Sequence, residues 1–457
     1  MGPAPKNAVL IEGPVGRTLV KLLIPMVFGI ISMVAFNLVD TILVGRLGSM
    51  ELAALSYTFP VVMVIMSIAM GLGTGSSAVI SVAIGEGNHR RVRRLTTDSI
   101  FLALLIVIFF VIAGQLTIDR VFSALGAPPH ILALTRRYMR IWYYGMICVV
   151  VPMVGNHAIR ASGDTKTPAI IMTVAALINL SVDPLLIFGL GPFPKLGIAG
   201  AAIATVCART TTLIVSLYVL GIKKKMLTSR IPSMSELLDS WKRILYIGLP
   251  AASTRIIMPL AIGVITRLLS SYGPEAVAGY GVATRIEFFL LTTLMALSVV
   301  LAPFIGQNWG AGRHDRVRKG VKFSKQFSLI YGAACLMVLL FIAKSLASIF
   351  NKDAAVVANI ASYLIIVPFA YGLQGVFLMS ISSMNVLNKP LHAALISILQ
   401  MFALYIPLAY LGSRFFGYRG VYGALAVSYV LAGIISHLVL NRVLDNDGKK
   451  EKSGQLT

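Results

Sequence analysis

The sequence predicts an all-α membrane protein of twelve transmembrane helices, arranged as two pseudosymmetric six-helix bundles. Three observations predict this fold: the composition, a series of long apolar runs, and an internal repeat. Of the 457 residues, 57% are hydrophobic and only 12% are charged. A soluble chain usually carries about 25% charged residues. The remaining charge lies in short tracts between apolar runs, which indicates a chain that crosses the bilayer many times.

The apolar runs are long enough to cross a membrane as helices. A crossing helix needs about 20 apolar residues, and only helices or closed barrels satisfy the backbone inside lipid. A barrel strand would be a roughly ten-residue segment of alternating polarity, which these runs do not resemble. The predicted spans are approximately residues 18–46, 52–84, 95–118, 131–158, 167–191, 197–221, 242–271, 276–308, 322–348, 355–386, 390–413 and 419–442.

Loop charge predicts the orientation of these spans. With both termini in the cytoplasm, roughly 26 of the 40 Lys and Arg residues lie inside and about 11 outside, as the positive-inside rule requires. The basic cluster 135–140 falls outside and is the main exception. The net charge of +23 therefore reflects topology rather than a nucleic-acid partner. We expect a multi-pass protein of the cell inner membrane that works as a monomer.

The second half of the chain repeats the first at a shift of about 225 residues. The segment 85–93 falls on 310–318, and Pro25 falls on Pro250. At nearly the same shift, 165–168 meets 387–390 and 197–202 meets 420–425. Six spans per repeat make the halves parallel, which is typical of an alternating-access transporter. The predicted organisation is an N-terminal lobe (1–221), a cytoplasmic linker (222–241), a C-terminal lobe (242–443) and a polar cytoplasmic tail (444–457).

Two acidic residues interrupt the apolar runs of the first half, Asp40 in the first span and Asp183 in the fifth. An ionisable group costs roughly 2.5–3.5 kcal/mol at the centre of a membrane helix, so each one requires a partner and a role. Asn37 precedes Asp40 by three residues and Asn179 precedes Asp183 by four, on the same helical faces. Each acid also has a structural alternative. Asp40 could cap the end of its helix, and Asp183 could lie at a kink where Asn179 is its hydrogen-bond partner.

Neutral oxygens in two other spans extend this group of polar residues. Asn156 in the fourth span and Thr205 in the sixth bring an amide and a hydroxyl. Carboxylates, amide carbonyls and hydroxyls are the ligands that hard cations prefer, and Na⁺ follows the same logic. The same group can hold a proton, so the residues leave H⁺ and Na⁺ open as the coupling ion. We expect no other cofactor.

The second half does not repeat the acids. Its seventh span carries Arg255, and its eighth carries Arg285 and Glu287, which point to different sides of the helix. A salt bridge between spans is the favoured role of Glu287, with a substrate or coupling role as the alternative. Coupling is therefore predicted to lie in the first half.

Two methionines and a proline add to the predicted site. Met33 and Met172 offer soft, adaptable contacts to varied ligands, although packing is the simpler explanation of both. Pro25 removes a backbone hydrogen bond from the first span and permits a bend there.

Five segments together resemble the multidrug and toxic compound extrusion (MATE) family across essentially the whole chain. They are Pro25 with 37–41, 71–75, 160–168, 179–184 and 197–205. Within this family, the placement of the acids in the amino-terminal lobe resembles the DinF-type branch. The resemblance implies a V-shaped pair of lobes that export amphipathic, often cationic compounds in exchange for H⁺ or Na⁺. It also implies a cation site formed by Asp40, Asn179, Asp183 and Thr205, with Tyr138 and Asn156 lining the same cavity and a bend at Pro25.

Three other functions compete with this reading. A flippase or exporter for lipid-linked or anionic substrates of the same superfamily is favoured by Arg209, Arg255 and Arg285, which lie within spans. An enzyme is disfavoured because no HExxH motif or Gly-rich phosphate loop with a lysine appears. A major-facilitator exporter is disfavoured because the loop 85–94 has Glu86 as its single acid.

Overall fold

The computed structural model describes residues 9–452, except for the side chains of residues 37, 38 and 447–452. The described chain folds into α-helices joined by short loops. The helices of the first half are α1 (Val15–Gly45), α2 (Ser49–Gly85), α3 (His89–Ala124), α4 (Pro129–Gly145), α5 (Ile147–Ala161), α6 (Lys166–Phe188) and α7 (Ile198–Tyr218). Those of the second half are α8 (Met234–Ser270), α9 (Pro274–Gly310), α10 (His314–Phe350), α11 (Ala354–Ile366), α12 (Tyr371–Val386), α13 (Pro390–Ile398) and α14 (Ile406–Lys452).

Four short helical segments complete the order: η1 (Val9–Ile11), η2 (Val219–Lys223), η3 (Val367–Ala370) and η4 (Leu399–Tyr405). Three of them continue a neighbouring helix: η2 extends α7, η3 joins α11 to α12, and η4 joins α13 to α14. Most predicted spans correspond to one helix or to one such joined run, but the fourth is divided between α4 and α5, and the last two share the run from α13 to α14.

The described helices account for twelve membrane crossings, as predicted. Ten helices or joined runs are long and apolar enough to cross, and α4 with α5, bent by 44°, forms an eleventh. The run Pro390–Asn446 has 57 residues, and a straight helix of that length would measure about 85 Å against a hydrocarbon core of about 30 Å. Gly417 breaks this run with φ 60° and ψ −147°. The run therefore contains two crossings.

The described chain forms two compact units that exchange short segments. The N-terminal unit is Ile24–Ala252, and the C-terminal unit comprises 9–23 and the chain from Ser253 onward. Helix α1 thus changes unit next to Pro25, and α8 changes unit just after Pro250. Proline lacks the N–H that would bond to the preceding turn, so both helices can bend at these points. The two prolines are the pair that the repeat superimposes.

Helix α8 begins earlier than the predicted seventh span, at Met234 inside the predicted linker 222–241. A capping box explains this start. The Ser233 N–H donates to Glu236 Oε2 at 3.2 Å, and the Glu236 N–H donates to Ser233 Oγ at 3.2 Å. Such reciprocal bonds satisfy backbone donors that the first turn leaves free.

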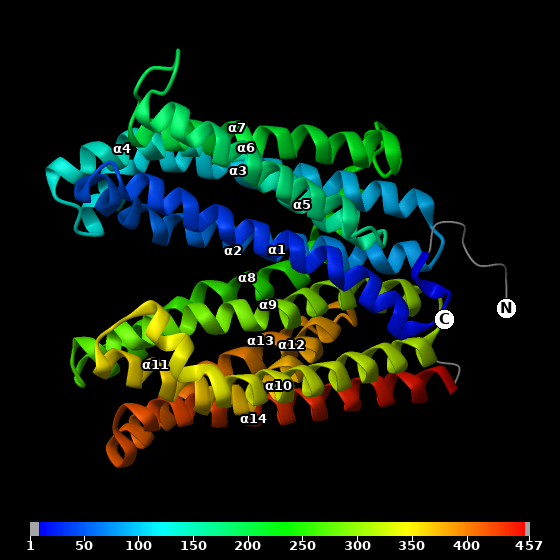
Figure 1. The fold of residues 1–457 in the computed structure, drawn as a ribbon. Helices are drawn as coiled ribbons and strands as arrows, with labels where there is room; N and C mark the ends of the chain where they lie inside the picture. Colours follow the sequence, from blue (N-terminus) through cyan, green and yellow to red (C-terminus); the bar gives the residue numbers. More distant parts are fainter. Residues whose placement is uncertain (1–8, 453–457) are drawn as a thin grey trace. The chain divides into compact units, whose positions relative to one another are not determined.

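The glycines of the segment 71–75 allow helices of the N-terminal unit to pack backbone to backbone. A Cβ at Gly75 would overlap the carbonyl oxygen of Ile244 in α8, and one at Gly71 would lie 2.9 Å from the Ala252 nitrogen. Gly73 faces the other way, toward the His157 ring in α5. The alternating glycines therefore let α2 approach two helices at once. Helices α6 and α7 of this unit also lie side by side (Figure 1).

Gly75→Ala is expected to destabilise the protein by about 1–3 kcal/mol, because the added methyl overlaps backbone that cannot move aside like a side chain. The measurement is thermal unfolding of the purified protein in detergent. Gly281→Ala in α9 is the matched control, since nothing lies within 4 Å of its added methyl. It should be neutral or stabilising by about 0.5–1 kcal/mol. A Gly75→Ala protein as stable as the control would contradict this account of the glycines.

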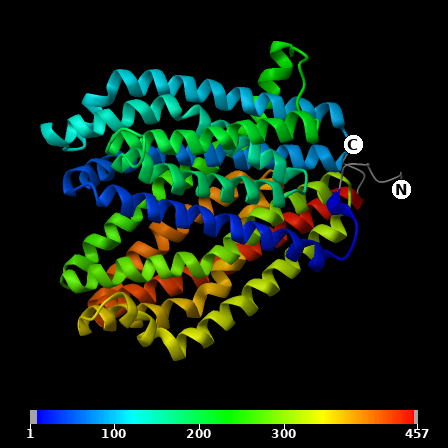
Figure 2. The same ribbon diagram turned by 45° about the horizontal axis from the view of Figure 1, so that its top comes forward.

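The C-terminal unit packs α12 between α10 and α14, and both views show its helices running roughly along a common direction (Figure 2). Gly332 of α10 and Gly372 of α12 approach closely enough that a methyl at Gly332 would overlap the Gly372 backbone. The segment 9–13 belongs to this unit: the Leu10 N–H donates to Gln307 Oε1 at 3.1 Å, and Asn308 Nδ2 donates to the Leu10 carbonyl at 3.1 Å.

Candidate ion-coupling site

Helix α1 approaches α6 closely in the N-terminal unit, and this contact aligns the two acids. A Cβ at Gly29 would lie 3.0 Å from Ala169 Cα, a tight contact that glycine avoids. One turn further, Ser32 Oγ lies 3.1 Å from Thr173 Oγ1. Asp40 and Asp183 follow these two hydroxyls by eight and ten residues, which is about 12 Å and 15 Å of helix. The acids therefore reach a similar depth.

Asp40 and Asp183 interact with each other and with Asn179. Asp183 and Asn179 are 0% and 1% exposed, and Asp40 is half-buried. The two carboxyls are close enough to influence one another, and Asn179 influences Asp183. In the part of the chain that the structure describes, however, Asp183 Oδ1, Asp183 Oδ2 and Asp40 Oδ1 meet no hydrogen-bond partner of proper geometry. Buried carboxyl oxygens without donors are uncommon and require an explanation.

Tyr138 and Asn156 come from the two segments of the broken fourth span. The break at Met146 divides the single span predicted at 131–158 into α4 and α5. Tyr138 on α4 is 6% exposed and lies near both Asp40 and Asp183. Asn156 on α5 is 9% exposed, and its Oδ1 has no hydrogen-bond partner among the described residues.

The geometry of these residues suits a small cation or a proton. Two negative charges close together in a medium of low dielectric constant repel each other strongly. A proton on one carboxyl, or a Na⁺ between carboxyl and amide oxygens, removes that repulsion and satisfies the unpartnered atoms. The residues present therefore fit either coupling ion.

Two other predicted residues of this lobe lie away from the acids along their helices: Met33 precedes Asp40 by seven residues and Met172 precedes Asp183 by eleven, which is about 10 Å and 16 Å of helix. Met172 lies beside Gly29: its Sδ would be 3.6 Å from a Cβ added at Gly29. Met33 follows Gly29 by one turn of α1. Thr205 is half-buried on α7, and it donates no hydrogen bond to Asp183 within the described part of the chain. The side chain of Asn37 lies outside the part that the structure describes.

Arg209 on α7 contacts an aromatic ring of α1. Its guanidinium carbon lies 5.3 Å from the centroid of the Phe36 ring, one turn before Asp40. A cation over an aromatic face is stabilised by about 0.5–2 kcal/mol, depending on exposure. This contact brings a positive charge to the segment of α1 that carries the acid.

In the C-terminal unit, Glu287 hydrogen bonds to tyrosines rather than forming the expected salt bridge. The hydroxyls of Tyr363 and Tyr429 donate to Glu287 Oε2 and Oε1, the second at 3.1 Å. Glu287 is 7% exposed, whereas Arg255 and Arg285 are exposed. Arg285 and Glu287 thus lie on different faces of α9, as their spacing predicts.

Sequence reasoning missed the aromatic environment of Glu287 and the buried acid Asp98. The Tyr280 and Tyr422 rings stack at 6.4 Å near Tyr363. Asp98 is 0% exposed and pairs with Arg94, four residues earlier on α3. The Arg94–Asp98 spacing is a detectable signal for a helical ion pair. The two tyrosines that bond to Glu287, Tyr363 on α11 and Tyr429 on α14, come from helices distant in the sequence and leave no local pattern.

Asp164 shows how the segment 160–168 is held at the start of α6, outside the membrane. Its carboxylate accepts hydrogen bonds from the Thr167 N–H at 2.9 Å and the Thr167 hydroxyl at 2.8 Å, and Lys224 lies 3.1 Å away. Burial alone would raise the pKa of Asp164, but these donors and the Lys224 ammonium outweigh it and hold the pKa below its usual range.

The fold and the buried acids define an integral membrane transporter built from two repeated halves, and comparison with known proteins identifies its family. The MatE family model matches the chain twice, at residues 25–185 and 250–411. The matches begin at Pro25 and Pro250, which confirms the repeat and its shift of 225 residues. The chain belongs to the MatE family, that is, the MATE transporters, and it is a transporter rather than an enzyme.

Individual relatives cover almost the whole chain. An FAD transporter of Shewanella oneidensis is 38% identical, over 95% of this chain and 96% of the relative. The probable multidrug resistance protein YoeA of Bacillus subtilis is 27% identical, over 88% of each chain. The crystal structure of the Vibrio cholerae MATE transporter VcmN in the bent form is 30% identical, with a TM-score of 0.90 over 94% of this chain and 97% of that one.

Proposed function

We propose that this protein is a cation-coupled exporter, in which H⁺ or Na⁺ entering through the N-terminal unit drives a small molecule out of the cell. The observation that carries the proposal is the group of Asp40, Asp183 and Asn179, with three buried carboxyl oxygens that lack donors among the described residues. The basic loops further support a protein of the inner membrane with both termini in the cytoplasm.

Coupling follows from the change in charge when an ion binds to or leaves these two carboxyls. An ion that neutralises the pair permits α1 to pack in one arrangement, and its loss leaves two like charges that favour another. Pro25 lies where α1 changes unit and supports a bend there. The positions of Asp40 and Asp183 in the first lobe also support the DinF-type branch. The proposed oxygen ligands also include Asn37 and Thr205. The proposed substrate contacts are Met33, Met172, Tyr138 and Asn156.

The substrate class has two candidates. Amphipathic, often cationic compounds follow from the acidic site and from relatives such as YoeA, whose name assigns it to multidrug resistance. A flavin dinucleotide is the second candidate, favoured by the 38% identity to an FAD transporter. Arg255 and Arg285 support it because both are exposed on membrane-crossing helices of the C-terminal unit, and guanidinium groups bind phosphates in bidentate fashion.

The test uses the purified protein in proteoliposomes loaded separately with ethidium and with FAD, under an imposed pH gradient or Na⁺ gradient. We expect gradient-driven movement of one substrate with one ion. If FAD is the substrate that moves, Arg255→Ala with Arg285→Ala should abolish its movement; if ethidium is, the same variant should move it at the wild-type rate. Movement of both substrates that is independent of either gradient would contradict coupled export.

A further inference from the structure

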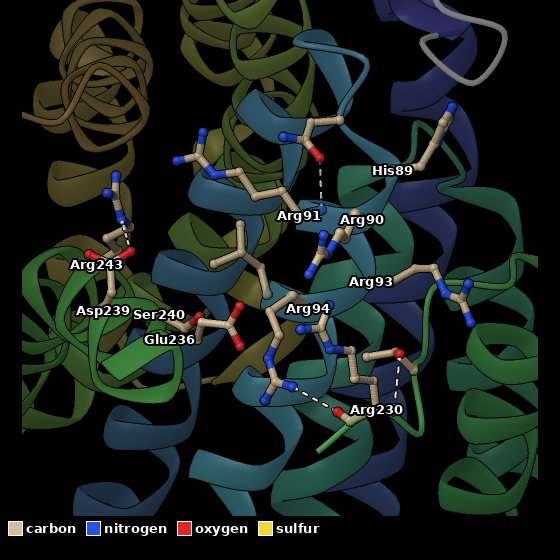
Figure 3. Close-up of a pocket in the computed structure, with 13 residues that line it drawn as sticks. His89, Arg90, Arg91, Arg93, Arg94, Arg230, Glu236, Asp239, Ser240 and Arg243 are labelled. Carbon is tan, nitrogen blue, oxygen red and sulfur yellow. Dashed lines mark hydrogen bonds and ion pairs between the residues drawn. The ribbon is translucent and has the colours of Figure 1, made fainter. Parts of the chain in front are cut away.

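A basic cavity lies in the N-terminal unit at the cytoplasmic ends of α3 and α8, away from the acidic site. It has a volume of about 460 Å³. Its walls come from the start of α3, the segment 228–230 and the first turns of α8 (Figure 3). Six arginines line it: Arg90, Arg91, Arg93, Arg94, Arg230 and Arg243.

Carboxylates neutralise half of these arginines. Arg91 pairs with Glu86 at 2.6 Å, Arg94 pairs with Asp98, and Arg243 pairs with Asp239 at 2.8 Å. Glu236, the other acid in the wall, caps α8 through its bond from the Ser233 N–H.

No carboxylate within the described chain pairs with the other three arginines, Arg90, Arg93 and Arg230. Arg93 Nε donates to the Leu227 carbonyl at 2.9 Å. Arg90 and Arg230 are exposed, and Figure 3 shows both near the middle of the cluster, with Arg243 and Asp239 to one side. The cavity therefore keeps a local excess of positive charge and free N–H donors.

The repeat shows that arginines of the second basic loop bind backbone oxygens of a neighbouring segment. At the shift of 225 residues, Arg91 and Arg93 correspond to Arg316 and Arg318. Arg316 donates to the backbone carbonyls of Gly13 at 2.8 Å and of residue 12 at 3.0 Å, so the segment 10–13 supplies oxygen acceptors to the second basic loop. In the first loop the linker supplies the carbonyls of residues 227 and 230. The cavity lies beside these bonds and offers room for further oxygens.

We propose that this cavity is a binding site for a phosphate-bearing anion, held chiefly by Arg90 and Arg230. Phosphate offers several charged oxygens in a geometry that matches guanidinium groups, and such charge-assisted bonds are about twice as strong as neutral ones. The anion joins α3, which carries Arg90, to the linker, which carries Arg230. The phosphate belongs either to the headgroup of an anionic phospholipid or to a soluble phosphorylated compound. The site is independent of the proposed coupling mechanism.

The soluble arm of the test titrates inorganic pyrophosphate into the full-length protein in detergent at constant ionic strength, by calorimetry. The lipid arm compares thermal unfolding of the protein in nanodiscs of phosphatidylglycerol and of phosphatidylcholine. Both arms use the wild type, Arg90→Ala/Arg230→Ala, and a charge-matched control, Lys319→Ala/Lys322→Ala, which removes two exposed charges from α10.

We expect the arginine variant to lose at least about tenfold in pyrophosphate affinity, or to lose the stabilisation by phosphatidylglycerol, since it removes the charge-assisted bonds of two guanidinium groups. The control should stay within about twofold of the wild type, as screened surface charges do. A response in the first arm identifies a soluble ligand, and a response confined to the second identifies a lipid headgroup. No response of the wild type in either arm, or equal losses in both variants, would overturn the proposal.

Discussion

Asp183→Asn is expected to reduce gradient-driven export to less than about a tenth of the wild-type rate, a rise of at least about 1.4 kcal/mol in the activation free energy of transport. Asp183 is fully buried, and neither of its carboxyl oxygens meets a donor among the described residues. Asparagine keeps the shape of the side chain but removes the charge that binds a proton or Na⁺. The residue therefore loses its coupling role without creating a cavity.

The measurement pairs transport in proteoliposomes with thermal unfolding in detergent. The unfolding temperature should be unchanged or higher, because the repulsion between Asp183 and Asp40 is gone. Asp119→Asn is the matched control, because Asp119 is an exposed acid that pairs with Arg136 at 2.7 Å rather than with the buried acids. If the Asp183→Asn protein exports at the control rate, Asp183 is a structural residue and the coupling assignment fails.

Glu287→Ala is expected to destabilise the protein by about 3–5 kcal/mol, the largest effect on stability among the substitutions considered. Two phenol hydroxyls, of Tyr363 and Tyr429, donate to this buried carboxyl. Truncation leaves both donors unsatisfied, at roughly 1–3 kcal/mol each, and adds the cost of a cavity. The result would assign Glu287 a structural role in the C-terminal unit.

Glu287→Gln separates structure from transport, because the amide oxygen still accepts a bond from one tyrosine. It should recover most of the stability and retain export. Glu275→Ala, in the first turn of the same helix, is the control and should cost about 0.3–1 kcal/mol through the helix dipole. A stable Glu287→Ala protein that no longer exports would show instead that Glu287 takes part in transport.

Hydrophobic patterning predicted the helices well because a membrane-crossing segment must be apolar throughout its length. The ends of the helices were less predictable. Helix α3 begins at His89 rather than residue 95, and α8 begins at Met234 rather than residue 242. Both extensions are polar helix outside the bilayer, started by local caps such as Asn88, whose side chain accepts from the Arg91 N–H. Hydropathy does not detect such caps.

The candidate site was predictable where its residues are few and costly to bury. Asp40 and Asp183 stand out because acids are rare within apolar runs, and helical spacing connects Asn179 to Asp183. The break at Met146, which sets Tyr138 on a different helix segment from Asn156, leaves no signal in an uninterrupted apolar run and was not predicted. The partners of Glu287 were equally hidden, since Tyr363 and Tyr429 lie 76 and 142 residues away in the sequence.

The central claim is that the carboxyls of the N-terminal unit couple ion entry to export, and Asp40→Asn tests it most directly. Purified wild type and Asp40→Asn are reconstituted in parallel, and export is recorded under an inward pH gradient and an inward Na⁺ gradient, with gradient-free exchange of labelled substrate as the control. The account predicts that Asp40→Asn loses the response to the gradient that drives the wild type and still exchanges substrate. Gradient-driven export at the wild-type rate by Asp40→Asn would contradict it.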